Sequence, residues 1–243
     1  MNVPGSDKSL SNLISPFRET IRRTIPRLIP VECFLCGAEG EFDVLCPACI
    51  AVLPRWRRGD ACPICALPAT AGRTCARCIS RPPPFDATIA VYDYVFPVGQ
   101  LVHALKYRTA LDLAAWLGAR LAECAGAGWD IVVPVPLHRG RLRERGFNQS
   151  LELARPLARR GIRLLRDGVV RSRATPSQAG LDARARWRNV RGTFDVEADL
   201  EGCSVVVVDD VMTTGATLRA LALALRRAGA VRVANLVVAR TPQ

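Results

Sequence analysis

The chain has 243 residues, of which 49% are hydrophobic and 23% charged, and these proportions are typical of a folded globular protein and exclude a disordered one. That length suits one large domain or two smaller ones. No run of about 18 apolar residues occurs, so no transmembrane helix is predicted, and the formal net charge of +12 favours phosphate-bearing or polyanionic ligands.

Residues 1–30 are treated as an N-terminal segment. They contain arginines but no continuous apolar stretch of the kind that a secretory signal peptide needs. An arginine-bearing start also resembles a transit peptide, but a short surface helix is the simpler interpretation. We therefore expect a cytoplasmic protein.

The next segment, residues 31–80, is dominated by cysteines in Cys-x-x-Cys pairs. The second two pairs repeat the first two at a constant offset of 29 positions, so each half reads C-x2-C-x9-C-x2-C. The pairs are Cys33/Cys36, Cys46/Cys49, Cys62/Cys65 and Cys75/Cys78. This regularity indicates an internal duplication of one small unit.

Such pairs suit zinc, because two thiolates on a tight turn occupy two corners of a tetrahedron with bonds of about 2.3 Å. We predict a double zinc ribbon with two structural zinc ions, since four thiolates leave no open position for catalysis. Four disulfides or a thioredoxin-like redox centre agree less well with the spacing and with the absence of a secretory signal. Short loops favour sequential pairing of the cysteines, and a cross-braced arrangement stays open.

Between the two halves lies a basic stretch with one aromatic residue, Arg55-Trp56-Arg57-Arg58. It is either a surface that contacts nucleic acid or protein, or a solvated linker whose tryptophan packs against a ribbon. The remaining cysteines, Cys124 and Cys203, are predicted to be small core residues.

Residues 81–84 read Arg-Pro-Pro-Pro and predict a stiff boundary before a second domain at 81–243. There, strand-like and helix-like segments alternate. Strands are predicted at 87–94, 130–135, 204–209 and 231–239, and helices at 99–106, 111–125, 148–160 and 214–228. Continuous apolar strands separated by helices indicate an α/β domain with a parallel sheet covered on both faces.

The sharpest feature of that domain is the segment 205–217. Four valines predict a central strand that delivers Asp209 and Asp210 to the rim of the sheet, and Thr213–Thr217 then turn into a helix. The N–H groups of such a turn and of the helix start bind a phosphate. The carboxylates suit sugar hydroxyls, a bound Mg²⁺ or a developing positive charge on a sugar carbon. Together these groups predict a site for a 5-phosphoribosyl ligand.

This segment resembles the phosphoribosyl pyrophosphate (PRPP) motif of type I phosphoribosyltransferases. Further segments extend the resemblance to the ComF family, which is similar to amidophosphoribosyltransferases and is associated with competence for natural transformation. They are His103–Tyr107, Val133–His138, Arg141–Gln149, Gln178 and Arg188–Phe194. The resemblance spans about residues 31–240. One departure is that many ComF proteins carry a single four-cysteine site, whereas this chain has two.

The resemblance implies a type I phosphoribosyltransferase-like sheet with flanking helices behind a small double zinc-ribbon domain. It assigns Asp209 and Asp210 as the ribose-side, catalytic carboxylates. The expected 5′-phosphate loop comprises Thr213, Thr214, Gly215, Ala216 and Thr217, and the expected pyrophosphate loop comprises Pro134, Val135 and Pro136. Mg²⁺ is expected to accompany the pyrophosphate.

Several basic residues near these loops have two interpretations each. Arg139 and Arg145 either bind the pyrophosphate or belong to a solvated loop. Lys106 either joins them or complements the dipole at the end of a helix. His138 is a weaker site candidate. The polar segment 174–188 is either a mobile loop over the site or an ordinary surface loop.

Two functions follow. The first is a PRPP-binding protein with phosphoribosyl-transfer chemistry on an unidentified acceptor, working in DNA uptake. The alternative is a non-catalytic nucleotide sensor or adaptor, whose zinc ribbons and arginines hold single-stranded DNA or a helicase or processing protein of the uptake machinery.

Overall fold

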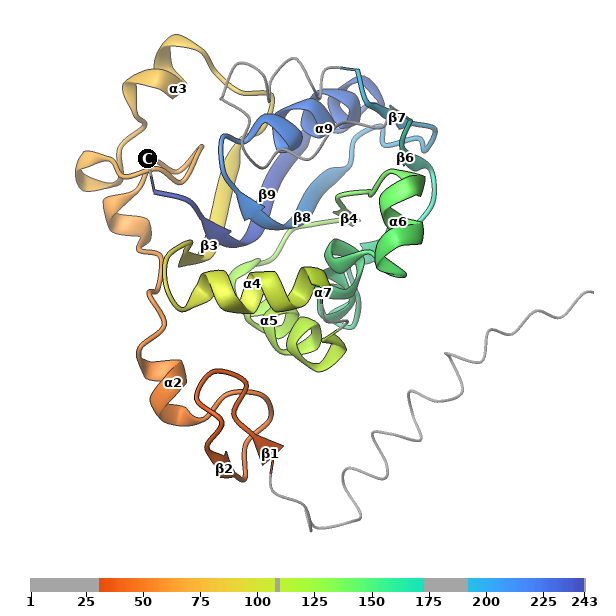
Figure 1. Cartoon of the computed structure of the whole chain (residues 1–243). Coiled ribbons are helices and arrows are strands. Elements are labelled where there is room, and N and C mark those ends of the chain that lie inside the picture. Colours follow the sequence, from red (N-terminus) through yellow and green to blue (C-terminus); the bar gives the residue numbers. More distant parts are fainter. Residues whose placement is uncertain (1–30, 108–109, 173–191, 243) are drawn as a thin grey trace, which may run out of the picture. The chain divides into compact units, whose positions relative to one another are not determined.

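The computed structural model describes residues 31–107, 110–172 and 192–242. The chain divides into two compact units, one ending at Ile50 and the other beginning at Ala51 (Figure 1). Within the described part of the chain, no helix has both the length and the apolar character needed to cross a membrane. The predicted domain limits at residues 30/31 and 80/81 remain a proposal.

The described part of the first unit is small. A two-stranded antiparallel ribbon joins β1 (Val31–Glu32) to β2 (Glu39–Gly40), and helix α2 (Pro47–Ala51) follows. So short a segment buries little apolar surface, and a metal ion is a usual source of the missing folding energy.

The second unit is built on a five-stranded parallel sheet. In sheet order its strands are β3 (Ala87–Asp93), β9 (Arg232–Arg240), β8 (Ser204–Met212), β4 (Ile131–Pro134) and β5 (Arg163–Leu164). The predicted parallel sheet is therefore confirmed. Strand β8 was expected to end at Asp209, but it continues to Met212 because β9 pairs with it as far as Arg240.

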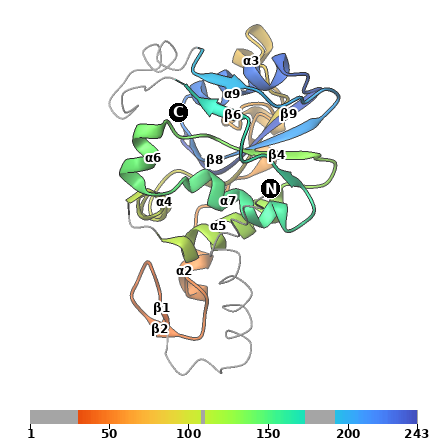
Figure 2. The ribbon, with the colours of Figure 1, turned by 90° about the vertical axis from the view of Figure 1, so that its right-hand side faces the viewer.

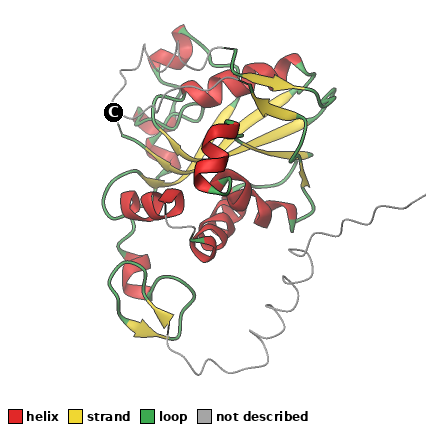
Figure 3. Cartoon of the chain, turned by 45° about the vertical axis from the view of Figure 1, so that its right-hand side comes forward, coloured by secondary structure: helices red, strands yellow, loops and turns green. Residues whose placement is uncertain are grey.

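Layers of structure cover both faces of the sheet (Figures 2 and 3). On one side lie α4 (Val98–Tyr107), α5 (Leu111–Cys124) and α7 (Gln149–Ala158); on the other lie α9 (Ala216–Arg227) and the antiparallel pair β6 (Val169–Arg171) and β7 (Phe194–Val196). Leu218, Leu221 and Leu225 of α9 are fully buried against the valines of β4 and β8. This apolar layer fixes the carboxyl ends of the strands relative to α9.

Several short elements were not predicted. The arginine-rich run forms helix α6 (Arg139–Arg145), which begins where the N–H of Gly140 donates to His138 Nδ1 at 3.2 Å and ends at Gly146 with a left-handed φ of 76°. His138 is thus a helix cap. Cys124 and Cys203, predicted to be core residues, are both only half-buried, although Cys203 packs against the core of the sheet.

The second half of the cysteine repeat is attached to the sheet. Strand β3 lies at the edge of the sheet, and the segment 54–63 runs along that edge. The N–H groups of Trp56 and Asp93 donate to the carbonyls of Val91 and Pro54, at 3.1 and 2.9 Å, and Thr88 donates to Pro63 at 3.0 Å. The segment therefore satisfies polar groups that an open edge strand leaves unpaired.

A close contact between two helices yields a stability prediction. A Cβ atom at Gly118 in α5 would lie 2.7 Å from the carbonyl oxygen of Leu153 and 2.9 Å from Cγ of Pro156 in α7. We expect Gly118→Ala to lower the free energy of unfolding by about 1–2 kcal/mol, because overpacking outweighs the gain in helix propensity.

Gly99 in α4 is the matched control, because a Cβ there would meet nothing within 4 Å. Gly99→Ala is expected to leave stability unchanged or to raise it by up to about 1 kcal/mol. Urea unfolding of the two variants measures the difference, and equal effects would contradict the close packing of α5 on α7.

Candidate functional site

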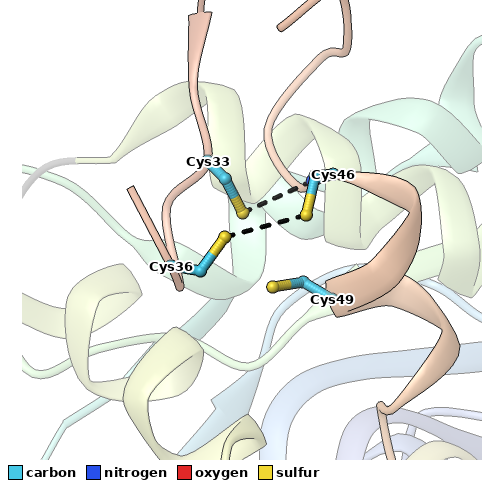
Figure 4. Close-up of side chains that lie close together, drawn as sticks. All are labelled: Cys33, Cys36, Cys46 and Cys49. Carbon is cyan, nitrogen blue, oxygen red and sulfur yellow. Dashed lines mark hydrogen bonds between the residues drawn. The ribbon is translucent and has the colours of Figure 1, made fainter. Parts of the chain in front are cut away.

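Each half of the cysteine repeat gathers its four sulfur atoms into one cluster. The atoms within each cluster all lie within 4.8 Å of one another. Cys36 and Cys46, in the first cluster, have their sulfurs 3.8 Å apart (Figure 4). Cys65 and Cys75, in the second cluster, have theirs 3.7 Å apart. A tetrahedral zinc ion with bonds of about 2.3 Å requires sulfur separations of about 3.8 Å. Both clusters therefore fit zinc, and the cysteines pair sequentially and not in a cross-braced manner.

The two clusters repeat the same local hydrogen bonds. Cys46 donates its N–H to Cys33 Sγ, and Cys75 donates to Cys62 Sγ, both at 3.4 Å. Burial acts to raise the pKa of the Cys33 thiol, but backbone donors, with Cys46 first, outweigh it and lower that pKa to about 6. A lowered pKa favours the thiolate that zinc binds.

The clusters give a prediction about metal content. We expect two zinc ions per chain, and we expect Cys33→Ser or Cys62→Ser to lower the content to one, because each removes one thiolate from a different cluster. Elemental analysis of the purified protein measures this ratio. Cys203→Ser, outside both clusters, serves as the control and retains two ions; one ion in the unmodified chain would contradict the prediction.

The tryptophan between the two halves packs against the protein. Trp56 is half-buried beside the core of the second unit, and its Nε1–H donates to the carbonyl of Ala66 at 3.2 Å. It is therefore not an open platform for stacking bases. Its neighbours Arg55, Arg57 and Arg58 are exposed, and Arg58 donates to the carbonyl of Cys124 at 3.3 Å.

The two carboxylates, Asp209 and Asp210, lie at the rim of the sheet. Strand β4 ends at Pro134, which is paired with Val208, so Asp209 and Asp210 extend β8 past the end of its neighbour. Asp209 Oδ1 accepts from Ser150 Oγ at 3.1 Å. Hence one carboxylate is held by the first turn of α7.

Asp210 is only 4% exposed and is held from two helices. Lys106 Nζ, in the last turn of α4, lies 3.0 Å from Asp210 Oδ2. Gln149 Nε2, in the first turn of α7, donates to the same oxygen at 3.5 Å. The structure thus brings Lys106 to the carboxylates.

The charges of this cluster depend on one another. Burial, with the charge of Asp210 adding to it, raises the pKa of Asp209 to about 7, although Lys106 opposes the shift. Burial acts to lower the pKa of Lys106, but the charge of Asp210 outweighs it and raises that pKa. Near neutral pH, Lys106 is therefore charged and Asp209 is only partly ionised.

The raised pKa of Asp209 gives a stability prediction. The pKa of this carboxyl is about 4 in the unfolded chain and about 7 in the folded protein. As the pH rises from 4 through 7, the folded state therefore loses stability relative to the unfolded state. We expect Asp209→Asn to raise the melting temperature at pH 8 and to have no such effect at pH 4. Calorimetric scans at both pH values test this, and a lower melting temperature at pH 8 would contradict it.

The turn after β8 leads directly into helix α9. Helix α9 begins at Ala216 and not at the predicted residue 214, because Gly215 adopts a left-handed φ of 77°. Thr214 Oγ1 accepts from the N–H of Ala216 at 3.4 Å. The first N–H groups of a helix lack partners within it, so Thr213–Thr217 form an arrangement that suits an anion.

The expected pyrophosphate loop lies beside the carboxylates. Val135 donates its N–H to Val208 at 3.0 Å, and its carbonyl accepts from Asn148 Nδ2 at 3.1 Å. Arg145 donates to Gln149 Oε1 at 3.1 Å and is thereby linked to Asp210. Arg139 is exposed at the start of α6. The segment 174–188 lies outside the described residues.

Four residues near the carboxylates and the turn were missed from the sequence. Gln149 and Ser150 follow Asn148, whose side chain accepts from the N–H of Ser150 and caps α7; that capping pattern was the available signal. Arg171 lies in strand β6, which was not predicted. Burial lowers the pKa of Arg171 and the charge of Arg141 lowers it further, whereas the charge of Asp209 raises it. Arg171 therefore lies in the electrostatic field of the site.

The fourth is Arg240, which follows the predicted end of its strand. It is 2% exposed, and within the described residues its guanidinium donates to backbone carbonyls. These are Cys65 (2.9 Å), Met212 (2.7 Å), Thr241 (3.0 Å) and Thr213. Arg240 thus connects the second cysteine cluster to the turn before α9.

Two family models match the chain. Residues 114–243 match the phosphoribosyl transferase domain, and residues 25–79 match the double zinc ribbon domain.

Similar curated proteins match over most of the chain. DNA utilization protein YhgH of Escherichia coli (strain K12) is 37% identical over 228 residues, which cover 88% of this chain and 98% of that protein. Competence protein F of Haemophilus influenzae is 30% identical over 64% of this chain and 73% of that protein. Competence protein ComFC of Bacillus subtilis is 25% identical over 81% of this chain and 89% of that protein.

Proposed function

Because this chain belongs to the ComF family of phosphoribosyltransferase-domain proteins, with YhgH and competence protein F among its relatives, we propose that it binds PRPP or a related 5-phosphoribosyl ligand together with Mg²⁺. We further propose that it transfers the phosphoribosyl group to an acceptor that is not yet identified.

One observation carries this proposal: two carboxylates and an N–H-rich turn follow one another at the end of β8. The turn Thr213–Thr217 suits the 5′-phosphate. Asp209 and Asp210 suit the ribose hydroxyls and the positive charge that develops on the sugar carbon as pyrophosphate leaves. No covalent intermediate with the protein is required.

Two basic side chains approach the carboxylates, and we propose that they also attract the pyrophosphate. Lys106 lies 3.0 Å from Asp210, and Arg145 reaches the same carboxylate through Gln149. Mg²⁺ would supply further positive charge to the leaving pyrophosphate. These groups support a ligand that carries phosphates at both ends of the ribose.

The test is a calorimetric titration of the zinc-loaded protein with PRPP, with and without Mg²⁺. We expect binding that Mg²⁺ strengthens, and weaker binding of ribose 5-phosphate, which lacks the pyrophosphate. Absence of PRPP binding would overturn the proposal. Pyrophosphate release in the presence of candidate nitrogen acceptors then tests the transfer step.

The names of the relatives suggest the process. YhgH is called a DNA utilization protein, and the other two are called competence proteins. We propose that this chain also acts in the uptake or use of DNA.

A second candidate function is favoured by the exposed guanidinium groups of Arg55, Arg57 and Arg58. In it, the protein is a nucleotide-sensing adaptor that holds single-stranded DNA. Binding of a fluorescent oligonucleotide would then weaken steeply with salt, and replacing these arginines by alanine would reduce the slope. Absence of binding at low salt would exclude this DNA-binding version.

A further inference from the structure

The two cysteine clusters belong to different compact units. The first cluster lies in the unit that ends at Ile50, whereas the second lies in the unit that contains the sheet. The backbone of the second cluster is bonded to that sheet: Thr88 of β3 donates to Pro63, and Arg240 of β9 donates to Cys65. The duplicated halves therefore have different structural surroundings.

We propose that the second cluster (Cys62, Cys65, Cys75 and Cys78), through Arg240, holds the phosphate loop Thr213–Gly215 in its binding conformation. Arg240 is then a positioning residue for the ligand and does not touch it. This inference rests on the proposed function, because the ligand it concerns is the 5′-phosphate of that site.

The geometry of Arg240 carries the first step. Its Nε donates to the carbonyl of Cys65 at 2.9 Å, and its Nη1 donates to the carbonyl of Met212 at 2.7 Å and to that of Thr213. The guanidinium is a rigid plane. Fixing one edge of it at the second cluster therefore fixes the positions of the two carbonyls on the other edge.

The planarity of the peptide bond carries the second step. In a trans peptide the C=O of one residue and the N–H of the next point in opposite directions. Because the carbonyls of Met212 and Thr213 face Arg240, the N–H groups of Thr213 and Thr214 point away from it. Arg240 thereby orients two donors of the phosphate loop toward the side opposite its guanidinium, where we place the 5′-phosphate.

Charge carries the third step. Among the described residues, no carboxylate forms an ion pair with Arg240, and a buried guanidinium without a counter-charge is strongly destabilising. A zinc ion with four thiolates has a net charge of about −2. The position of Arg240 therefore depends on zinc in the second cluster.

The test compares three full-length variants with the unmodified chain. Arg240→Lys retains the charge but loses the planar fork. Cys62→Ser and Cys33→Ser occupy equivalent positions in the two halves, so each should lose one zinc ion. We measure zinc content, the affinities for ribose 5-phosphate and for pyrophosphate, and loop exchange, which is the hydrogen exchange of the Thr241 amide that donates to the Met212 carbonyl at the start of the loop, at 3.1 Å.

We expect Arg240→Lys and Cys62→Ser to speed loop exchange at least tenfold, and Cys33→Ser to leave it unchanged. Arg240→Lys should keep two zinc ions and weaken ribose 5-phosphate binding about tenfold or more, while pyrophosphate binding stays the same. A variant that merely loses its fold would bind both ribose 5-phosphate and pyrophosphate more weakly.

The outcomes separate the two proposals. If the unmodified chain binds no PRPP, the proposed function fails, and loop exchange in Arg240→Lys still decides whether Arg240 orders the loop. If the unmodified chain binds PRPP, and the Arg240→Lys variant has the same loop exchange and the same affinity for ribose 5-phosphate as the unmodified chain, the inference about Arg240 is wrong. Equal loop exchange in Cys33→Ser and Cys62→Ser would remove the special role of the second cluster.

Discussion

Replacing Asp209 and Asp210 together by asparagine is expected to lower the affinity for PRPP by about 10²- to 10⁴-fold. A hydrogen bond to a charged group contributes about 1.5–3 kcal/mol, so the loss of two such bonds costs about 3–6 kcal/mol. Asparagine keeps the size of each side chain, and its oxygen still accepts from Ser150. Calorimetric titration with PRPP and Mg²⁺ measures the change.

The matched control is Asp86→Asn. Asp86 forms an ion pair with Arg226 at 2.6 Å and also accepts from the N–H of Val233, away from the carboxylates of β8. This control is expected to bind PRPP like the unmodified chain. Unchanged affinity in the Asp209/Asp210 variant would show that these carboxylates do not contact the ligand.

The second large effect is expected from Gly215→Ala. Gly215 has φ of +77°, where a residue with a Cβ atom is disfavoured by about 1–2 kcal/mol, and that Cβ would lie 2.6 Å from Met212 Cε. Met212 Cε is the end of a flexible side chain and can move aside, so the larger cost is the positive φ, which the loop relieves by changing its backbone conformation. We expect the affinity for ribose 5-phosphate to fall at least about tenfold, since the N–H groups of the loop no longer converge on one phosphate.

Gly202→Ala separates the backbone cost from the effect on the site. Gly202 has a similar φ of +71°, but a Cβ there would meet nothing within 4 Å. It should lose comparable stability and bind ribose 5-phosphate normally. If both variants bind alike, the conformation of Gly215 is not important for the phosphate.

The main strands, the principal helices and both cysteine clusters were predictable because their signals are local. Four consecutive valines before Asp209 indicate a buried strand, and the repeated Cys-x-x-Cys spacing indicates a metal site. The end of β8 was placed too early because its last residues owe their strand conformation to pairing with β9. Such pairing leaves no trace in the pattern of a single segment.

Other features were unpredictable because they depend on contacts between distant segments. Strands β5 and β6 have two and three residues, too few to show a period. Arg240 appeared to be a polar residue after an apolar strand, and only the fold shows that it reaches both Cys65 and Thr213. The cysteine spacing is identical in the two clusters, so it could not indicate that the second cluster is hydrogen-bonded to the sheet.

The most direct test of the central claim is a crystal structure of the zinc-loaded protein with PRPP and Mg²⁺. It should show the 5′-phosphate on the N–H groups of Thr213–Thr217 and the ribose hydroxyls on Asp209 and Asp210, with the pyrophosphate toward Lys106. Ligand density at another place, or none at a concentration that saturates binding in solution, would contradict the account.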